Sequence, residues 1–194
     1  MRPVTIGTAR LTLRPFAPED APAVHAACQD PDILRWTALP EPYERRHAQE
    51  YVLGIAPSGW REDTAYTFGA FTRDGGELVG SVGLVRITPP DPAGREAELG
   101  YWTAKEQRRR GYTAEAAGAV ADWALGELGV ERLEWVAEVG NTASRAVAER
   151  LGFVMEGTLR ARIPFRGTRR DAWIASLLPS DRRRAPGAPV PPAP

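Results

Sequence analysis

The chain has 194 residues, which is enough for one domain with a hydrophobic core and leaves little room for a second. Its 25 basic and 25 acidic residues give a formal net charge of zero, which disfavours a nucleic-acid-binding protein that relies on bulk electrostatics. With one cysteine, Cys28, it cannot form an intrachain disulfide, and no apolar run approaches the roughly 18 residues of a membrane-spanning helix. The sequence therefore predicts a cytoplasmic protein with no membrane segment.

The first half of the chain alternates between strand and helix patterns. Apolar and polar residues alternate over 8–16, which predicts a strand, and acidic residues after Pro18 predict the start of a helix. A further helix is expected over 42–55. Residues 64–88 then predict a hairpin whose turn contains Asp74-Gly75-Gly76, and 95–103 predicts the next strand.

The second half also alternates between helix and strand patterns and ends in a segment of biased composition. The expected elements are a helix over 112–128, a strand over 132–139, a helix over 141–151 and two final strands over 153–163 and 169–178. This order predicts one α/β domain over 1–178, in which a mixed sheet carries helices on both faces. Residues 179–194 are rich in proline and arginine without any periodicity, which predicts a disordered tail.

The first candidate for chemistry is the segment Arg108-Arg109-Arg110-Gly111-Tyr112-Thr113, between a predicted strand and the longest helix. A glycine there lets backbone N–H groups converge on an anion, while the helix start and the arginines add positive charge. These are the properties of a pyrophosphate-binding loop, although the segment matches neither the Walker motif nor Gly-x-Gly-x-x-Gly. Taken alone, it is just as typical of a charged surface turn.

Two further segments indicate a functional site only when they are considered together with the first. Asn141 and Ser144 begin a helix, for which an asparagine cap is the simplest explanation. In the strand over 95–103, alternation places Glu98 and Trp102 on one face and Tyr101 on the other.

Together, in this order and spacing, these segments resemble the GNAT superfamily of acetyl-CoA-dependent N-acetyltransferases. The closer resemblance is to the branch with the bacterial acetyltransferases of ribosomal-protein N-termini. It covers residues 8–178 and includes the opening strand, Glu98–Trp102, the loop, Asn141 with Ser144, and Asp171 in the last strand. Thr113 departs from the pattern, which usually has glycine or alanine there. The resemblance implies a GNAT fold with a mostly antiparallel, seven-stranded, splayed sheet.

The resemblance also implies the site. Acetyl-CoA is expected in the cleft between the fourth and fifth strands, against the backbone of Tyr101, Trp102 and Thr103, with its phosphates on 108–113. Asn141 would orient the cofactor arm, Ser144 would protonate the leaving thiolate, and no metal is implied. The expected acceptor pocket contains Trp36, Tyr43, Trp60, Arg160, Arg162 and Phe165, although Trp36 and Trp60 are equally typical of a core.

The expected reaction is direct attack of an amine on a thioester, with Glu98 as the base and a backbone N–H near Trp102 as the oxyanion donor. Glu96, Glu138 or a chain of waters are the alternatives to Glu98. At pH 7.5, deprotonating a lysine costs about 4 kcal/mol, whereas an α-amine costs under about 1 kcal/mol. A site with a single carboxylate therefore favours an α-amine of a protein N-terminus or a small molecule.

Two other functions stay open at this stage. One is a GNAT-fold protein that binds acyl-CoA without catalysis and acts as a sensor or partner. The other is a nucleic-acid or ribosome-binding protein, which is disfavoured by the net charge. The sequence leaves the acceptor and the oligomeric state open, a homodimer included.

Overall fold

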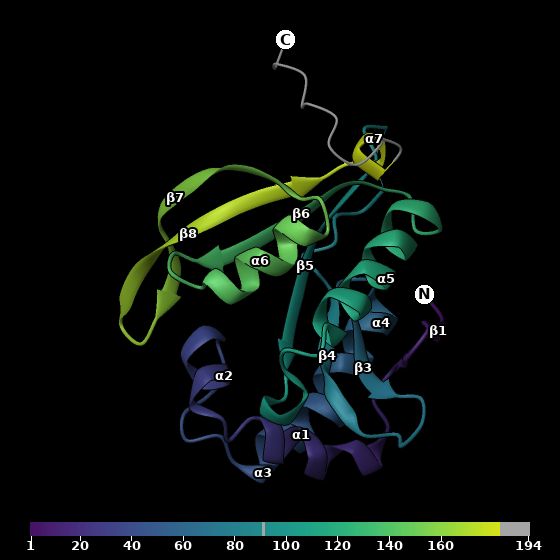
Figure 1. The fold of residues 1–194 in the computed structure, drawn as a ribbon, viewed down its shortest axis with the longest axis vertical. Helices are drawn as coiled ribbons and strands as arrows, with labels where there is room; N and C mark the ends of the chain where they lie inside the picture. The colour runs from purple at the N-terminus through teal and green to yellow at the C-terminus, as the bar shows by residue number, and fades with distance from the viewer. Residues whose placement is uncertain (91, 183–194) are drawn as a thin grey trace.

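The computed structural model describes residues 1–90 and 92–182 and contains one eight-stranded sheet in the order β1-β2-β3-β4-β5-β6-β8-β7 (Figure 1). All neighbouring strands run antiparallel except β5 and β6, which run parallel. The strands are Ile6–Gly7 (β1), Leu11–Arg14 (β2), Tyr66–Thr72 (β3), Leu78–Val85 (β4), Arg95–Thr103 (β5), Val130–Glu138 (β6), Val154–Phe165 (β7) and Thr168–Leu177 (β8).

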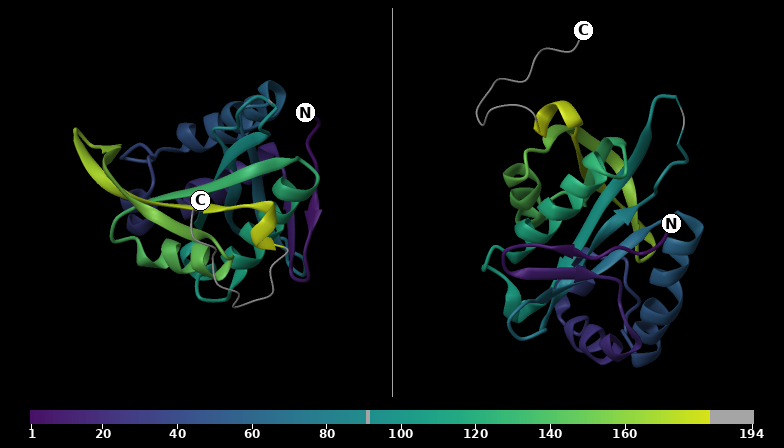
Figure 2. Two further views of the ribbon diagram at one scale, coloured as in Figure 1. Left: turned by 90° about the horizontal axis from the view of Figure 1, so that it is seen from above. Right: turned by 90° about the vertical axis from the view of Figure 1, so that its right-hand side faces the viewer.

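Helices cover both faces of this sheet (Figure 2). α5 (Tyr112–Gly126) and α6 (Thr142–Arg150) lie on one face, and α1 (Ala21–Ala27), α2 (Pro31–Trp36) and α3 (Arg45–Glu50) lie on the other. Each face has its own hydrophobic cluster. The larger contains the buried side of α5 with Phe68 and Leu99, and the smaller contains Phe16, Val24 and Phe71.

The N-terminal segment differs from the prediction of one strand over 8–16, so the sheet has eight strands where seven were predicted. The chain reverses after β1, where the Thr8 N–H donates to the Leu11 carbonyl at 2.9 Å. Glu115 of α5 accepts from the Thr8 hydroxyl at 2.6 Å and from the Arg10 N–H at 2.9 Å. This carboxylate, from a distant part of the chain, stabilises the turn that separates β1 from β2.

The helix predicted over 42–55 is also longer and less regular than expected. α3 continues through a π-helical turn, Tyr51–Ile55, into α4 (Ala56–Glu62). The extra residue per turn in a π-helix shifts the side chains that follow, and such turns are frequent at functional sites.

At the other end of the chain, Pro179–Arg182 form the short helix α7 within the segment predicted to be disordered. The rest of that predicted tail, 183–194, lies outside the described residues.

Candidate active site

The ladder between β5 and β6 ends early, and this creates a cleft. Their last paired residues are Glu98 and Glu134, while β5 continues beside β4 to Thr103 and β6 continues beside β8 to Glu138. The two strands therefore separate, and a cavity of about 400 Å³ opens between them. Its lining includes Trp36, Tyr51, Ser81, Glu98, Gly100, Tyr101, Trp102, Trp135, Glu138, Asn141, Ser144 and Ile163.

Ser144, in the first turn of α6, is fixed by groups from two strands. Its Oγ accepts a hydrogen bond from the indole Nε1 of Trp135 at 3.1 Å and donates to the Tyr101 hydroxyl at 3.2 Å. The Tyr101 hydroxyl in turn donates to the Ser144 carbonyl at 2.9 Å. Burial raises the pKa of Tyr101 to about 12, so this phenol stays protonated at neutral pH. The arrangement holds one serine hydroxyl at the wall of the cleft.

Asn141 caps the same helix, as its position suggested. Its Oδ1 accepts from the backbone N–H of Ser144 at 3.2 Å, and its side chain lines the cleft. Its amide nitrogen donates to no group among the described residues, so it remains able to contact a ligand.

Glu98 projects from the opposite face of β5. Its Oε2 is buried and lies 3.1 Å from Nη1 of Arg86 in an ion pair, but it accepts no geometrically sound hydrogen bond from the described residues. Burial raises the pKa of Glu98, while Arg86 and Arg162 act in the opposite direction. An incompletely satisfied carboxylate with a raised pKa has the properties of a general base.

The other carboxylates considered from the sequence fit that role less well. Glu138 accepts hydrogen bonds from Arg35 at 2.7 and 2.8 Å and from Arg170 at 2.6 Å. Chiefly through the bonds from Arg35, these contacts lower the pKa of Glu138, which makes it a weaker base. Glu96 is exposed and does not line the cleft.

The loop before α5 has the conformation that its glycine suggested. Gly111 is exposed and has a φ of +78°, a left-handed conformation that side chains with a Cβ rarely adopt. It precedes a helix of 15 residues, whose free N–H groups begin at Tyr112. Arg109 and Arg110 are exposed beside it. The hydroxyl of Thr113 shares a hydrogen bond with that of Thr103 at 2.7 Å, so it is already engaged.

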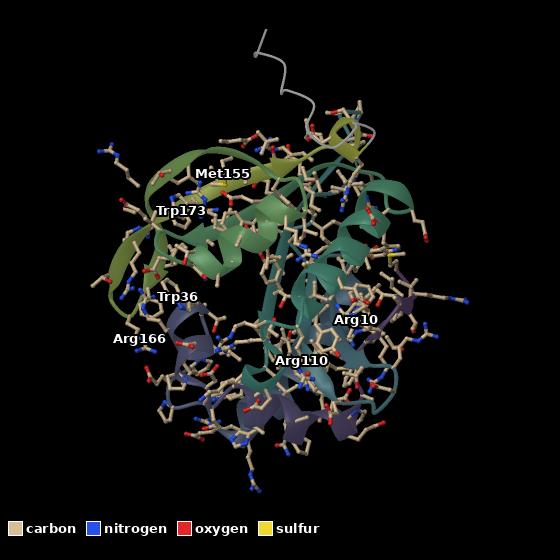
Figure 3. The ribbon with its side chains drawn as sticks, viewed as in Figure 1. Arg10, Trp36, Arg110, Met155, Arg166 and Trp173 are labelled. Atoms are coloured by element: carbon tan, nitrogen blue, oxygen red, sulfur yellow. The ribbon has the colours of Figure 1, made fainter. Side chains whose placement is uncertain are left out.

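Two arginines near this loop have contacts that the sequence analysis did not predict. Arg108 turns toward the start of α2, where it pairs with Asp30 and, at 3.0 Å, with Asp32. Its charge therefore joins the loop to α2. Arg10 of the N-terminal segment lies beside Arg110 (Figure 3) and donates to its carbonyl at 3.0 Å. Its guanidinium also stacks over the ring of Tyr112.

The expected acceptor pocket is only partly brought together. Trp36 lines the cleft and stacks with Arg35, whose guanidinium carbon lies 4.1 Å from the ring centroid. The guanidinium carbon of Arg35 also lies 5.5 Å from the ring centroid of Phe165, near the tip of the β7–β8 hairpin. Arg160 is exposed on β7. Burial raises the pKa of Tyr43, which packs in the smaller cluster between His25 and His47, away from the lining.

Trp60 is the second aromatic residue that the structure places in a core. It is 2% exposed and packs against Phe68 and Trp123, because the longer helical segment carries it to the sheet. Of the two alternatives that the sequence left open for Trp60, the structure shows the core, and Tyr43 does not line the cleft.

Four residues that line or flank the site had no role in the sequence analysis. Trp135 holds Ser144, Arg86 pairs with Glu98, Arg10 borders the loop, and Tyr51 lines the cleft with its hydroxyl 3.0 Å from the Ser81 hydroxyl. Arg86 lies inside the hairpin predicted over 64–88, whereas the observed strand β4 ends at Val85, so the sequence carried no signal for this residue.

No nucleophilic cysteine faces the cleft. Cys28 is buried in the smaller cluster, and this burial raises the pKa of its thiol to about 12. Among residues 1–90 and 92–182, no three histidine, cysteine or acidic side chains are grouped to hold a metal ion. No helix in the same part of the chain is long and apolar enough to cross a membrane.

A sheet that separates between its two parallel strands, with a glycine-containing loop before the long helix that follows β5, is the architecture of a GNAT acetyltransferase. The family model "Acetyltransferase (GNAT) domain" matches residues 10–154. The chain therefore belongs to the GNAT acetyltransferase family and is an N-acetyltransferase.

Curated relatives and solved structures agree with this assignment. The "Uncharacterized N-acetyltransferase YoaA" of Bacillus subtilis is 28% identical over 88% of this chain and 94% of its own length. The "Putative ribosomal N-acetyltransferase YdaF" of the same organism is 39% identical over 53% of this chain and 55% of its own.

A structure from Vibrio cholerae, described as a "putative ribosomal-protein-serine acetyltransferase", superposes with a TM-score of 0.80 at 28% identity, covering 91% of this chain and 98% of its own. RimL, described as a ribosomal L7/L12 alpha-N-protein acetyltransferase in complex with coenzyme A, shares the fold with a TM-score of 0.79 at 21% identity, covering 90% and 98%.

Proposed function

We propose that this chain transfers an acetyl group from acetyl-CoA directly to a primary amine, with an α-amine as the preferred acceptor. The observation that carries the proposal is the cleft at the separation of β5 and β6, which is lined from both faces of the sheet. Glu98 approaches it from one face, and Ser144 with Tyr101 from the other. An amine and a thioester that enter from opposite faces can meet there without a covalent enzyme intermediate.

The loop before α5 fits the phosphates of acetyl-CoA. Gly111 leaves the backbone open to close approach, and the start of a long helix supplies N–H groups and partial positive charge. Arg109 and Arg110 add full charges. The shared fold of an acetyltransferase with bound coenzyme A supports this assignment. The cosubstrate supplies the activated acetyl group.

Each proposed residue role concerns a proton transfer or the stabilisation of charge in the reaction. Glu98 accepts a proton from the attacking amine, directly or through water, and the new C–N bond forms as the C–S bond breaks. A backbone N–H near Trp102 stabilises the negative charge on the carbonyl oxygen. Ser144 donates a proton to the departing thiolate, and Trp135 and Tyr101 position its hydroxyl.

The acceptor class follows from the strength of the base. The site offers one carboxylate suited to remove a proton, and an α-amine, with a pKa of about 8, needs far less help than a lysine, with a pKa of about 10.4. The relatives described as ribosomal acetyltransferases support a protein N-terminus as the acceptor.

A thiol-release assay with acetyl-CoA and a panel of amines tests the proposal. The panel contains a peptide with a free N-terminus, the same peptide with a blocked N-terminus and a lysine, free amino acids, and aminoglycosides. We expect the free peptide to react faster than its blocked twin. Faster acetylation of the blocked twin contradicts the acceptor class. Binding of acetyl-CoA with no turnover on any amine favours a sensor instead.

A further inference from the structure

Strand β7 carries a pronounced bulge beside the cleft. Leu159 pairs with Ala172 and Ile163 pairs with Arg170, so residues 160–162 stand opposite Asp171 alone. Bulges of this kind redirect side chains and are frequent near active sites.

The bulge is held in an unfavourable backbone conformation from both sides. Ala161 has a φ of +51°, which non-glycine residues rarely adopt. Its N–H donates to Oδ1 of Asp171 at 2.7 Å, and its carbonyl accepts from Nε of Arg169 at 2.5 Å. Two side chains of β8 therefore fix the direction in which Arg160 and Arg162 leave the strand.

This part of the hairpin has a strong positive charge within a chain of zero net charge. Residues 160–170 contain five arginines and no acidic residue. Arg166 pairs with Glu41, Arg170 pairs with Glu138, and Arg169 donates to backbone carbonyls.

The remaining two, Arg160 and Arg162, are exposed, and their guanidinium groups form no ion pair or hydrogen bond in the part of the chain that the structure describes; Arg162 acts on Glu98 only through its charge. We call them the bulge arginines. Their charges are therefore available to a ligand.

The bulge arginines border the acceptor side of the cleft. Ile163, the next residue of β7, lines the cleft, and Arg162 lies near enough to Glu98 to affect its titration. Figure 1 shows the hairpin curving toward α2 at this end of the molecule. Positive charge here repels a protonated amine, so it complements some other, anionic part of the acceptor.

We propose that the bulge arginines bind acidic side chains of the polypeptide that follows the acceptor amine. This inference rests on the proposed function, since it assumes that a peptide amine reaches Glu98. A chain whose first residue lies in the cleft can leave it past Ile163, along the rim that carries these arginines. Acidic residues soon after the N-terminus then pair with guanidinium groups that form no ion pair in the free enzyme.

Peptides that share a first residue and differ in the next four test the proposal. One carries acidic residues there, one neutral residues and one lysines, and kcat/KM is measured by thiol release at low salt. We expect the acidic peptide to exceed the neutral one by about three- to tenfold, as two exposed ion pairs imply. The ratio should shrink toward one at high salt, because the pairs are screened.

A charge-matched pair of double variants locates the preference. R160Q/R162Q should bring the ratio of acidic to neutral peptide close to one, whereas R61Q/R150Q, on α4 and at the end of α6, should keep it. A wild-type ratio of one, or a ratio retained in R160Q/R162Q, overturns the inference. Acetylation of the neutral peptide leaves the proposed function intact in that case, and its absence with every peptide rejects the proposed function itself.

Binding of RNA is the other use of exposed arginines, and it gives a different result. A fluorescently labelled RNA oligonucleotide should show no change in anisotropy that depends on Arg160 and Arg162. RNA binding that R160Q/R162Q abolishes, with no charge preference among peptides, overturns the inference in favour of a nucleic-acid partner.

Discussion

Ser144 shows how one hydroxyl acquires a defined direction. A free serine hydroxyl rotates, but here Oγ receives the Trp135 indole N–H and donates to Tyr101. Neither partner titrates at neutral pH, because an indole has no acidic proton in this range and burial raises the pKa of Tyr101 to about 12. The hydroxyl therefore stays protonated at neutral pH, as its proposed donation to a departing thiolate requires.

We predict that Ser144→Ala lowers kcat and leaves the affinity for acetyl-CoA nearly unchanged, since the lost interaction exists mainly in the transition state. The loss should fall at or below the range of about 10²–10⁴-fold that general acids contribute. Steady-state kinetics and calorimetric titration measure the two quantities. Thr142→Ala, an exposed hydroxyl in the same turn, should change neither, and full kcat in Ser144→Ala would limit Ser144 to a structural role.

Two opposing influences act on the pKa of Glu98, burial and nearby arginines, and Arg86 makes the larger of the two arginine contributions. Burial raises the pKa of Glu98, and the guanidinium of Arg86, 3.1 Å away, lowers it. Arg86→Gln should therefore raise this pKa further. Since the base must be ionised to act, the acidic limb of the kcat/KM profile should move to higher pH.

The profiles of wild type, Arg86→Gln and Glu98→Gln on one α-amine peptide check this prediction. The rate deficit of Glu98→Gln relative to wild type should be largest between the pKa of Glu98 and that of the amine. Above the pKa of the amine, the variant should partly recover. Arg61→Gln on α4 is the control for loss of a surface charge. An acidic limb that Arg86→Gln leaves in place, or parallel profiles for Glu98→Gln, would assign the proton transfer to another group.

At the scale of elements, α5 depends on a glycine at each end. Gly111 before the helix has a φ of +78° and Gly129 after it has a φ of +69°, so a Cβ causes backbone strain at both. Gly129 has no heavy atom within 4 Å of an added Cβ, and Gly111 has only the guanidinium of Arg10 at 3.5 Å.

We predict that Gly111→Ala and Gly129→Ala lower the free energy of unfolding by similar amounts, about 1 kcal/mol each. Only Gly111→Ala should also weaken acetyl-CoA binding, and Gly111→Val should weaken it more, because the side chain obstructs the loop that approaches the phosphates. Thermal unfolding and calorimetric titration separate the two effects. Equal affinities in the two alanine variants would remove the loop from the cosubstrate site.

The regular elements could be predicted from sequence because they depend on neighbouring residues. Alternation identified β3 to β6, and helical spacing identified α5. β1 was missed because its turn depends on Glu115, about 105 residues from Arg10. The same distinction holds for the site. Glu98 and Gly111 lie in local sequence patterns and could be predicted. The contact of Ser144 with Tyr101 spans 43 residues and arises from the packing of α6 on the sheet.

At the scale of the whole molecule, the sheet consists of two parts joined by a short parallel ladder. β1 to β5 form one part and β6 to β8 the other, and β5 pairs with β6 only between Arg95 and Glu98. Glu138 of β6, which lines the cleft, makes a second connection, since it binds Arg35 of α2 and Arg170 of β8. Because α2 packs with the first part, this carboxylate holds the two parts together beside the cleft.

We predict that Glu138→Gln raises the KM for the amine acceptor and leaves acetyl-CoA affinity unchanged, since α2 loses its charged link to β6. It should also lower the free energy of unfolding at pH 7 by about 1–2 kcal/mol, a modest value because both arginines are about one-third exposed.

The pH dependence of this loss has a definite sign. Hydrogen bonds from Arg35 and Arg170 lower the pKa of Glu138 below its unfolded value, so its contribution is complete above that unfolded value and disappears as the pH falls through the folded one. The difference in stability between wild type and Glu138→Gln should therefore vanish in acid.

Glu156→Gln separates this mechanism from a general loss of acid stability. Glu156 binds Arg132 and Ser176 at the far end of the hairpin and also has a lowered pKa, chiefly through its bonds from Arg132. Its variant should show the same disappearance of the stability difference in acid, while the acceptor KM stays at the wild-type value. Urea unfolding between pH 3 and 7 and kinetics at pH 7.5 measure both. An acceptor KM that rises equally in the two variants would show that the position of α2 beside the cleft does not depend on Glu138.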